Sequence, residues 1–225
     1  MLSRRILKSH CHPTHGSSAN HFQGKFRSLS DEIFSLKQNG QDFTIPWHAA
    51  EDATVHEVEL GVIMNGLRRD QVEKWEDRVG AYVLLLDMGD MAMIKNALTN
   101  GLSWTIAKHQ DNFLVLGDLI RKETIHDPHN IDLLLKINGE TRQSDNTGNM
   151  IFGIDKQIDY LENEANIPLI EGDLLLTGTP ENIAPVREGD CLEAVMMQNG
   201  QEISKIVENK IQRAVKPSFI DHAKL

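Results

Sequence analysis

The run Val55–Met64 constrains the fold more than any other segment, because apolar residues recur in it at every second position. This alternation is typical of a β-strand, in which side chains two residues apart share a face. The apolar side chains from Val58 onward would then face a core. Glu57 and Glu59 would both point to the opposite side of the strand.

Two carboxylates held close together repel and raise each other's pKa, unless a cation lies between them. A third carboxylate is available, because the apolar strand-like run Ala81–Leu86 ends directly at Asp87. Three carboxylates without a nearby cysteine suit the hard ions Mg²⁺, Mn²⁺ or Ca²⁺ better than zinc. The alternative is that Glu57 and Glu59 form the solvated face of an edge strand.

Asn-Gly pairs separate several of the other strand-like runs. Asn138-Gly139 and Asn199-Gly200 each lie between two such runs. Both pairs predict type I′ hairpins, since Asn and Gly tolerate the positive φ that these turns require. Three short segments have helical character: Arg69–Val79, Ala92–Leu98 and Ile154–Asn163. Without sustained alternation of strands and helices, we expect an α+β fold that is mainly β, mostly antiparallel or mixed, with a few short helices.

Charge is distributed unevenly along the 225 residues. Residues 1–30 carry five Lys or Arg and no acid, whereas the remainder carries 18 basic and 33 acidic residues, a net charge of −15. An acid-free basic leader is typical of mitochondrial targeting, and an acidic body argues against nucleic-acid binding. No apolar run approaches the ~20 residues of a membrane span, so we expect none. The two cysteines provide no disulfide framework.

We divide the chain into a basic N-terminal arm (1–30), one domain (31–215) and a tail (216–225). The arm is too polar to build its own core, so it needs a surface to lie against. It could fold back on the acidic body or dock on another subunit. We expect docking on another subunit.

Several motifs together resemble the fumarylacetoacetate hydrolase family. They are His56–Gly61, Leu86–Met88, Trp104–Lys108 and Thr177–Pro180, in the family's order and spacing. The resemblance covers roughly residues 33–197 and is greatest to the small mitochondrial branch that acts as acylpyruvate hydrolase and oxaloacetate decarboxylase. It implies a β-rich roll and a homodimer.

The resemblance also implies roles for five residues. Glu57, Glu59 and Asp87 match the family's Mg²⁺ or Mn²⁺ ligands. Such an ion would chelate the α-keto acid end of a substrate and stabilise an enolate. Lys108 matches an active-site lysine, which would hold developing negative charge. Thr179 matches a residue that contacts the substrate carboxylate.

Other positions depart from the family. Met91, Ala92 and Ile94 stand where the family has arginine, aspartate and glutamine, and a thioether cannot replace a guanidinium that grips a carboxylate. His21 aligns with the family's catalytic histidine, but Gly24 replaces the glutamate that orients it. We interpret His21 as a coincidental match and not as a general base.

These departures lead to two functional hypotheses. The first is an accessory or structural subunit of a mitochondrial assembly, which retains a divalent-metal site but has degraded catalytic residues. The alternative is an active, metal-dependent acylpyruvate hydrolase or oxaloacetate decarboxylase that takes a small α-keto acid. The clustered replacements on the chemical side favour the accessory subunit.

Overall fold

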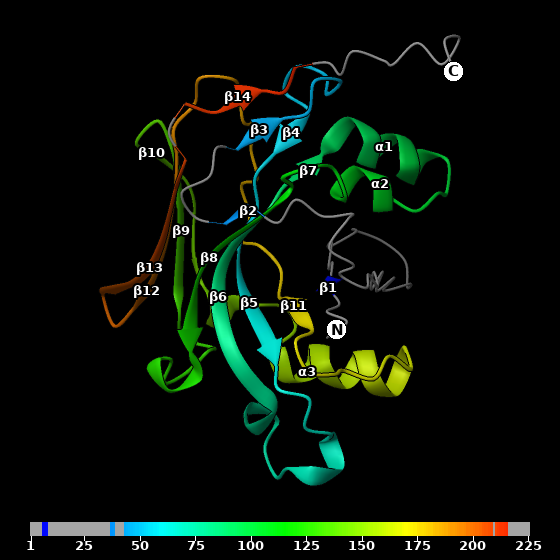
Figure 1. The fold of residues 1–225 in the computed structure, drawn as a ribbon, viewed down its shortest axis with the longest axis vertical. Helices are drawn as coiled ribbons and strands as arrows, with labels where there is room; N and C mark the ends of the chain where they lie inside the picture. The colour runs from blue at the N-terminus through cyan, green and yellow to red at the C-terminus, as the bar shows by residue number, and fades with distance from the viewer. Residues whose placement is uncertain (1–5, 9–36, 39–42, 209, 216–225) are drawn as a thin grey trace, which may run out of the picture.

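The computed structural model describes residues 6–8, 37–38, 43–208 and 210–215. Its largest element is a mixed six-stranded sheet, in which the outermost strands pair in parallel and the others are antiparallel. In spatial order its strands are β1 (Ile6–Lys8), β11 (Leu174–Leu176), β5 (Val58–Met64), β6 (Val79–Asp87), β8 (Leu114–Arg121) and β2 (Lys37–Gln38). Figure 1 shows β5 and β6 at the centre of the molecule.

A second, antiparallel sheet lies beside the first. In order, its four strands are β10 (Glu140–Asn146), β9 (Asp132–Ile137), β12 (Leu192–Gln198) and β13 (Gln201–Glu208). The two hairpins turn at the predicted pairs, with φ of 52° and 81° at Asn138 and Gly139 and of 53° and 74° at Asn199 and Gly200. The predicted type I′ geometry is therefore confirmed.

Two short strand pairs complete the β structure of the described residues. They are β3 (Thr44–Ile45) with β14 (Gln212–Arg213), and β4 (Thr54–Val55) with β7 (Gly89–Asp90). The second pair matters for the site, because β4 directly precedes β5 and β7 directly follows β6. The start of β5 and the end of β6 are therefore held together by the β4–β7 pairing as well as by their own.

The main hydrophobic core lies between the two sheets. Val58, Leu60 and Val62 of β5 pack in the same cluster as Leu135 of β9 and Ala194 of β12, and all five are fully buried. The apolar half of the Val55–Met64 alternation therefore faces this core, as predicted. The carboxylates of that run consequently point to the other face of the six-stranded sheet.

The helices are short and lie at the edges of the sheets (Figure 1). They are α1 (Met91–Thr99), α2 (Thr105–Lys108) and α3 (Ile154–Asp159), which continues as the π-helical turn η5 (Tyr160–Glu164). The Asp90 carboxylate caps α1 by accepting a hydrogen bond from the Met93 N–H at 2.9 Å. Two of the three predicted helices, Ala92–Leu98 and Ile154–Asn163, are thus confirmed to within a few residues.

The third predicted helix, Arg69–Val79, is wrong. The segment forms two 3₁₀ turns, η1 (Arg69–Gln71) and η2 (Trp75–Arg78), and Val79 already begins β6. Arg78 explains the difference, because its buried guanidinium contacts both Glu162 carboxylate oxygens at 2.6 Å and its Nε donates to Leu67 O. These contacts hold Arg78 next to the first residue of β6, where the chain is already turning from η2 into the strand. Two further 3₁₀ turns are η3 (Lys122–Thr124) and η4 (Thr147–Asn149).

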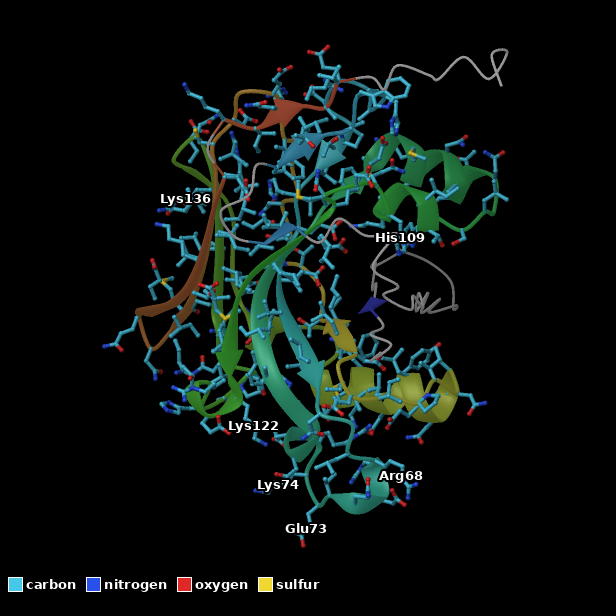
Figure 2. All side chains as sticks on the ribbon, viewed as in Figure 1. Arg68, Glu73, Lys74, His109, Lys122 and Lys136 are labelled. Carbon is cyan, nitrogen blue, oxygen red and sulfur yellow. The ribbon has the colours of Figure 1, made fainter. Side chains whose placement is uncertain are left out.

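Figure 2 shows this connection between β5 and β6 at one end of the molecule, where Arg68, Glu73 and Lys74 are exposed. The mixed, mainly-β fold with few short helices confirms the predicted fold class. Among the described residues, no helix has the length and apolar character needed to cross a bilayer. His21, most of the arm (1–30) and the tail (216–225) lie outside the described residues, so the proposed division of the chain stays a prediction.

Candidate metal centre

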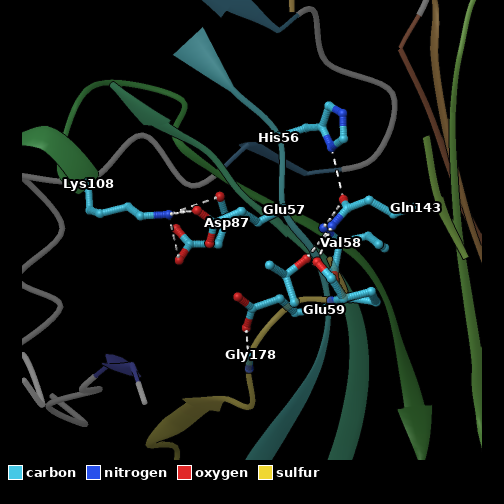
Figure 3. Close-up of polar contacts among 10 residues, drawn as sticks. His56, Glu57, Val58, Glu59, Asp87, Lys108, Gln143 and Gly178 are labelled. Atoms are coloured by element: carbon cyan, nitrogen blue, oxygen red, sulfur yellow. Dashed lines mark hydrogen bonds and ion pairs between the residues drawn. The ribbon is translucent and has the colours of Figure 1, made fainter. Parts of the chain in front are cut away.

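Three carboxylates converge where β5 begins and β6 ends. Glu57 directly precedes β5, Glu59 lies within it, and Asp87 is the last residue of β6. The Asp87 N–H donates to Glu57 O at 2.8 Å, which locks the two strand ends together. One side-chain oxygen from each residue lies within 4.8 Å of the other two, and we call this group the acidic cluster (Figure 3). The exposed fractions are only 7%, 3% and 0%, so the alternative of a solvated strand face is wrong.

Lys108, the last residue of α2, points its ammonium into the acidic cluster. Its Nζ lies 2.5 Å from Glu57 Oε1 and 3.4 Å from Asp87 Oδ2 (Figure 3). Gly89 makes this approach possible, because a Cβ at that position would lie only 3.2 Å from both Lys108 Cε and Nζ. The lysine side chain is 2% exposed, so it is a buried partner of the carboxylates and not a surface residue.

The cluster is electrostatically unbalanced. Burial, Asp87 and Glu57 together raise the pKa of Glu59 to about 8, against the opposing effects of the Gly178 N–H and Lys108. Burial alone lowers the pKa of the Lys108 ammonium, but attraction to Asp87 and Glu57 outweighs it and raises the pKa overall. With all four groups ionised, three carboxylates and one ammonium leave two negative charges in a buried space. One divalent cation would neutralise them.

The segment around the glutamates is held by Gln143 of β10. Its Oε1 accepts hydrogen bonds from His56 Nδ1 at 2.9 Å and from the Val58 N–H at 3.2 Å. Burial lowers the pKa of His56 to about 4, although the bond to Gln143 acts in the opposite direction. His56 is therefore neutral at pH 7.

The loop after β11 contacts the same strand. Gly178 has a φ of +102°, a conformation that favours glycine, and its N–H donates to Glu59 Oε2 at 2.9 Å. The neighbouring Thr179 hydroxyl donates to Val58 O at 2.9 Å and accepts from Gln143 Nε2 at 2.8 Å. The predicted substrate contact Thr179 therefore lies next to the glutamate strand, with its hydroxyl proton already bonded to the backbone.

The donor set fits a hard divalent cation. Oxygens bound to Mg²⁺, Mn²⁺ or Ca²⁺ lie about 2.0–2.6 Å from the ion, so two ligands on opposite sides are separated by roughly 4–5 Å. The three cluster oxygens lie within 4.8 Å of one another, which is compatible with this span. Carboxylate ligands are also the type that these ions prefer. The acidic cluster is therefore consistent with a divalent-metal site.

Comparison with known proteins agrees with this geometry. The protein-family model described as fumarylacetoacetate (FAA) hydrolase C-terminal matches residues 17–209. The chain belongs to the fumarylacetoacetate hydrolase family. The acidic cluster, Lys108 and Thr179 all lie inside the matched range.

Curated relatives in this family share a description. A protein of Arabidopsis thaliana described as mitochondrial oxaloacetate tautomerase FAHD1 is 37% identical over 184 residues, which cover 81% of this chain and 78% of that protein. The human protein of the same description is 43% identical over 140 residues, which cover 62% of each chain. These relatives are described as enzymes, which favours the enzyme hypothesis over the accessory-subunit hypothesis.

Solved structures in the fumarylacetoacetate hydrolase family share the fold. The fumarylpyruvate hydrolase of Pseudomonas aeruginosa, solved with Mn²⁺ and pyruvate, superimposes with a TM-score of 0.76 at 21% identity, covering 94% of this chain and 91% of that one. The yeast family protein ynq8 gives the same TM-score and identity and covers 97% of both chains.

Three of the positions that we interpret as departures from the family pattern, Met91, Ala92 and Ile94, lie on α1, whereas Gly24 lies outside the described residues. Met91 is half-buried, Ala92 is exposed and Ile94 is 5% exposed. At these three positions α1 therefore carries apolar side chains, which cannot form an ion pair with a carboxylate. His56 and Gln143 hold the backbone next to the acidic cluster, and no role was predicted for either residue. His56 adjoins Glu57 in sequence. The hydrogen-bonding role of Gln143 has no signal in the strand periodicity, because its partners lie 85 and 87 positions away.

Proposed function

We propose that this protein is a divalent-metal-dependent enzyme acting on a short 2-oxo acid, with the interconversion of the keto and enol forms of oxaloacetate as its first candidate reaction. The observation that carries this proposal is the buried convergence of Glu57, Glu59 and Asp87 with the Lys108 ammonium. The descriptions of the Arabidopsis and human relatives as oxaloacetate tautomerases support the choice of reaction.

Each residue of the cluster has a role in this proposal. Glu57, Glu59 and Asp87 would hold Mg²⁺ or Mn²⁺, with Ca²⁺ as a further hard ion that suits the ligands. The bound ion would supply Lewis-acid polarisation of the 2-oxo acid end of the substrate. Lys108, whose pKa is raised by the carboxylates, would remain protonated and hold the negative charge of the enolate that lies between the two forms. In the enol-to-keto direction, solvent would take the enol O–H proton and a proton from solvent would be added at C3.

The substrate end of the site is proposed to include Thr179. Its hydroxyl proton is bonded to Val58 O, so it can accept from a substrate but cannot donate to a carboxylate unless that bond is replaced. Thr179 is therefore assigned to the wall of the site. His21 is not needed in this proposal.

Tautomerisation fits the residues of this chain better than carbon–carbon cleavage. It transfers one proton and breaks no carbon–carbon bond, so no residue has to activate an attacking water. By the resemblance, the family's residues at four positions grip a substrate or orient a water. This chain has other residues there: Met91, Ala92, Ile94 and Gly24. Acylpyruvate hydrolysis, which needs an attacking water, is therefore a secondary candidate. Oxaloacetate decarboxylation needs no attacking water and is placed second because the relatives are described as tautomerases. The accessory subunit ranks below all three reactions.

We also propose a mitochondrial location and self-association as a homodimer. The Arabidopsis and human relatives are described as mitochondrial, and residues 1–30 contain five basic residues and no acid. The homodimer rests on the family resemblance of the sequence. Import of a tagged full-length chain into isolated mitochondria, and light scattering of the purified protein, test the two statements.

The reaction itself is tested with freshly dissolved enol-oxaloacetate, whose ultraviolet absorbance falls as the keto form appears. The full chain with Mg²⁺ or Mn²⁺ should accelerate this fall above the rate of metal alone, and a chelator should abolish the acceleration. Glu59→Gln should abolish it too. Glu193→Gln is the matched control, because Glu193 pairs with Lys136 and Lys205 in a partly exposed contact outside the cluster.

Pyruvate formation and acylpyruvate cleavage are measured in parallel to separate the three reactions. Acceleration that is insensitive to the chelator, or equal loss in Glu59→Gln and Glu193→Gln, would contradict the proposal. If a folded, metal-loaded protein accelerates none of the three reactions, the accessory-subunit hypothesis gains the first place.

A further inference from the structure

Gln143 is the single fully buried side chain of β10. The strand otherwise presents exposed and half-buried residues, whereas Gln143 has no exposed surface. The pairing between β10 and β9 shifts register between Thr141 and Gln143. Such a bulge re-aims the side chain that follows it. Here it turns a glutamine from the edge of the four-stranded sheet toward the start of β5.

The orientation of the Gln143 amide follows from its partners. Pro180 O can only accept, so the atom 2.8 Å from it is the amide nitrogen, Nε2. The Val58 N–H can only donate, so its partner is the amide oxygen, Oε1. Because Oε1 also lies 2.9 Å from His56 Nδ1, that ring nitrogen carries the proton. Both donors and both acceptor positions of the amide are then used.

The oxygen end of Gln143 holds Glu57 from both sides. The chain leaves β4 at Val55 and enters β5 at Val58, so Glu57 lies in the gap between two strands. Gln143 Oε1 contacts the side chain before Glu57 and the backbone after it (Figure 3). The gap is thereby fixed in one conformation. The direction of the Glu57 carboxylate depends on that conformation.

The nitrogen end of Gln143 holds the loop that contacts Glu59. Nε2 donates to the Thr179 hydroxyl and to Pro180 O, both at 2.8 Å. Gly178, the residue before Thr179, donates its N–H to Glu59 Oε2. One amide therefore joins the backbone around Glu57 to the loop that orients Glu59.

We propose that Gln143 is a positioning residue that sets the spacing of Glu57 and Glu59, and through it the affinity of the site for a divalent cation. This inference rests on the proposed function, because it concerns the same ion. Residues that orient metal ligands without touching the metal typically change affinity by ~10–100-fold when they are replaced. Gln143 would act in this way through two backbone segments at once.

The test compares Gln143→Met with Thr147→Val in the full chain. Met is close to Gln in shape but makes none of the four hydrogen bonds. Thr147→Val is a control of similar kind, because the buried Thr147 hydroxyl accepts from the Ile131 N–H and donates to Pro128 O beyond the end of β10. Mn²⁺ binding is read from the paramagnetic resonance signal of the free ion. Hydrogen exchange is measured for peptides that cover 56–60 and 178–182.

Gln143→Met should raise the Mn²⁺ Kd about 10-fold or more and speed exchange in both peptides. Thr147→Val should lose stability while keeping the wild-type Kd and exchange in these peptides. If Gln143→Met does not fold, Gln143→Asn serves instead, because its shorter side chain keeps the amide but cannot reach both segments. It should also weaken Mn²⁺ binding.

A folded Gln143 variant with the wild-type Kd would overturn the inference, as would equal Kd changes in the Thr147→Val control. If the wild-type chain itself binds no Mn²⁺, the proposed function fails instead. The exchange rates of 56–60 and 178–182 then decide separately whether Gln143 orders both segments.

Discussion

The Lys108 ammonium reaches the Glu57 carboxylate by passing over Gly89, where an added Cβ would lie 3.2 Å from the lysine Cε and Nζ. The glycine and the lysine are 19 positions apart in sequence. Their contact nevertheless determines how close a positive charge comes to the acidic cluster. Gly89, which has no side chain, thus determines where the Lys108 ammonium lies.

Gly89→Ala should therefore displace Lys108 by a few tenths of an ångström and lengthen its contact with Glu57. Small misplacements of positioned groups have large kinetic effects, up to ~100-fold for about 1 Å. We expect kcat for oxaloacetate tautomerisation to fall by roughly 10-fold, with Mn²⁺ affinity nearly unchanged. Gly80→Ala is the control, since a Cβ there meets Asn65 Cβ at an ordinary 3.4 Å. Equal kcat in the two variants would refute the role of Gly89.

Lys108→Met should separate metal binding from catalysis. Removing the ammonium leaves three buried carboxylates without a cation beside them, so a divalent ion should bind several-fold more tightly. Activity should fall by about 100-fold or more, because the ammonium that would hold developing charge beside the bound ion is lost. Calorimetric titration with Mn²⁺ and the tautomerisation assay measure the two effects. Weaker Mn²⁺ binding by a folded Lys108→Met variant would contradict this electrostatic account.

Metal binding should be coupled to proton release near neutral pH. The raised pKa of Glu59, about 8, means that this carboxyl is largely protonated at pH 7 without a metal. A cation binds the ionised form, so each binding event displaces a proton and affinity rises with pH. The affinity should increase from pH 6 to about pH 8 and level off above it. Titration calorimetry in two buffers of different ionisation enthalpy counts the protons, and a count of zero at pH 7 would contradict the prediction.

The sequence predicted the parts of this site that depend on local periodicity. The alternation through Val58, Leu60 and Val62 places Glu59 on the opposite face of β5, and the end of the apolar run places Asp87 at the end of β6. Both follow from the period of a strand. Asn-Gly pairs likewise predicted the two hairpins, because positive φ is a local property.

The other features of the fold and the site depend on contacts between segments far apart in the sequence, and such contacts leave no periodic signal. Gln143 looks like any residue of an exposed strand until the bulge in β10 turns it toward His56. The helical spacing of Val72, Trp75 and Val79 predicts a helix through Arg78. Its partner Glu162 is 84 positions away and was not foreseeable from that spacing.

The pair of buried Arg78 and half-buried Glu162 gives a last prediction, which concerns stability. Arg78 has no exposed surface, and its guanidinium contacts both carboxylate oxygens of Glu162 at 2.6 Å. Glu162 Oε1 also accepts from the Leu169 N–H at 3.2 Å, so the pair joins η2 to the segment after η5. Glu162→Gln leaves a buried guanidinium without a counter-charge, and such changes cost about 3–5 kcal/mol.

Urea denaturation should therefore show a much lower midpoint for Glu162→Gln. Asp70→Asn, which removes the exposed partner of Arg68, should leave the midpoint almost unchanged, because solvent screens that pair. No residue of the Arg78–Glu162 contact belongs to the acidic cluster. Mn²⁺ should accordingly bind the folded Glu162→Gln protein with the wild-type Kd, in contrast to the Gln143 variants. A loss of metal affinity equal to that of Gln143→Met would mean that general destabilisation, and not the positioning of Glu57 and Glu59, controls the site.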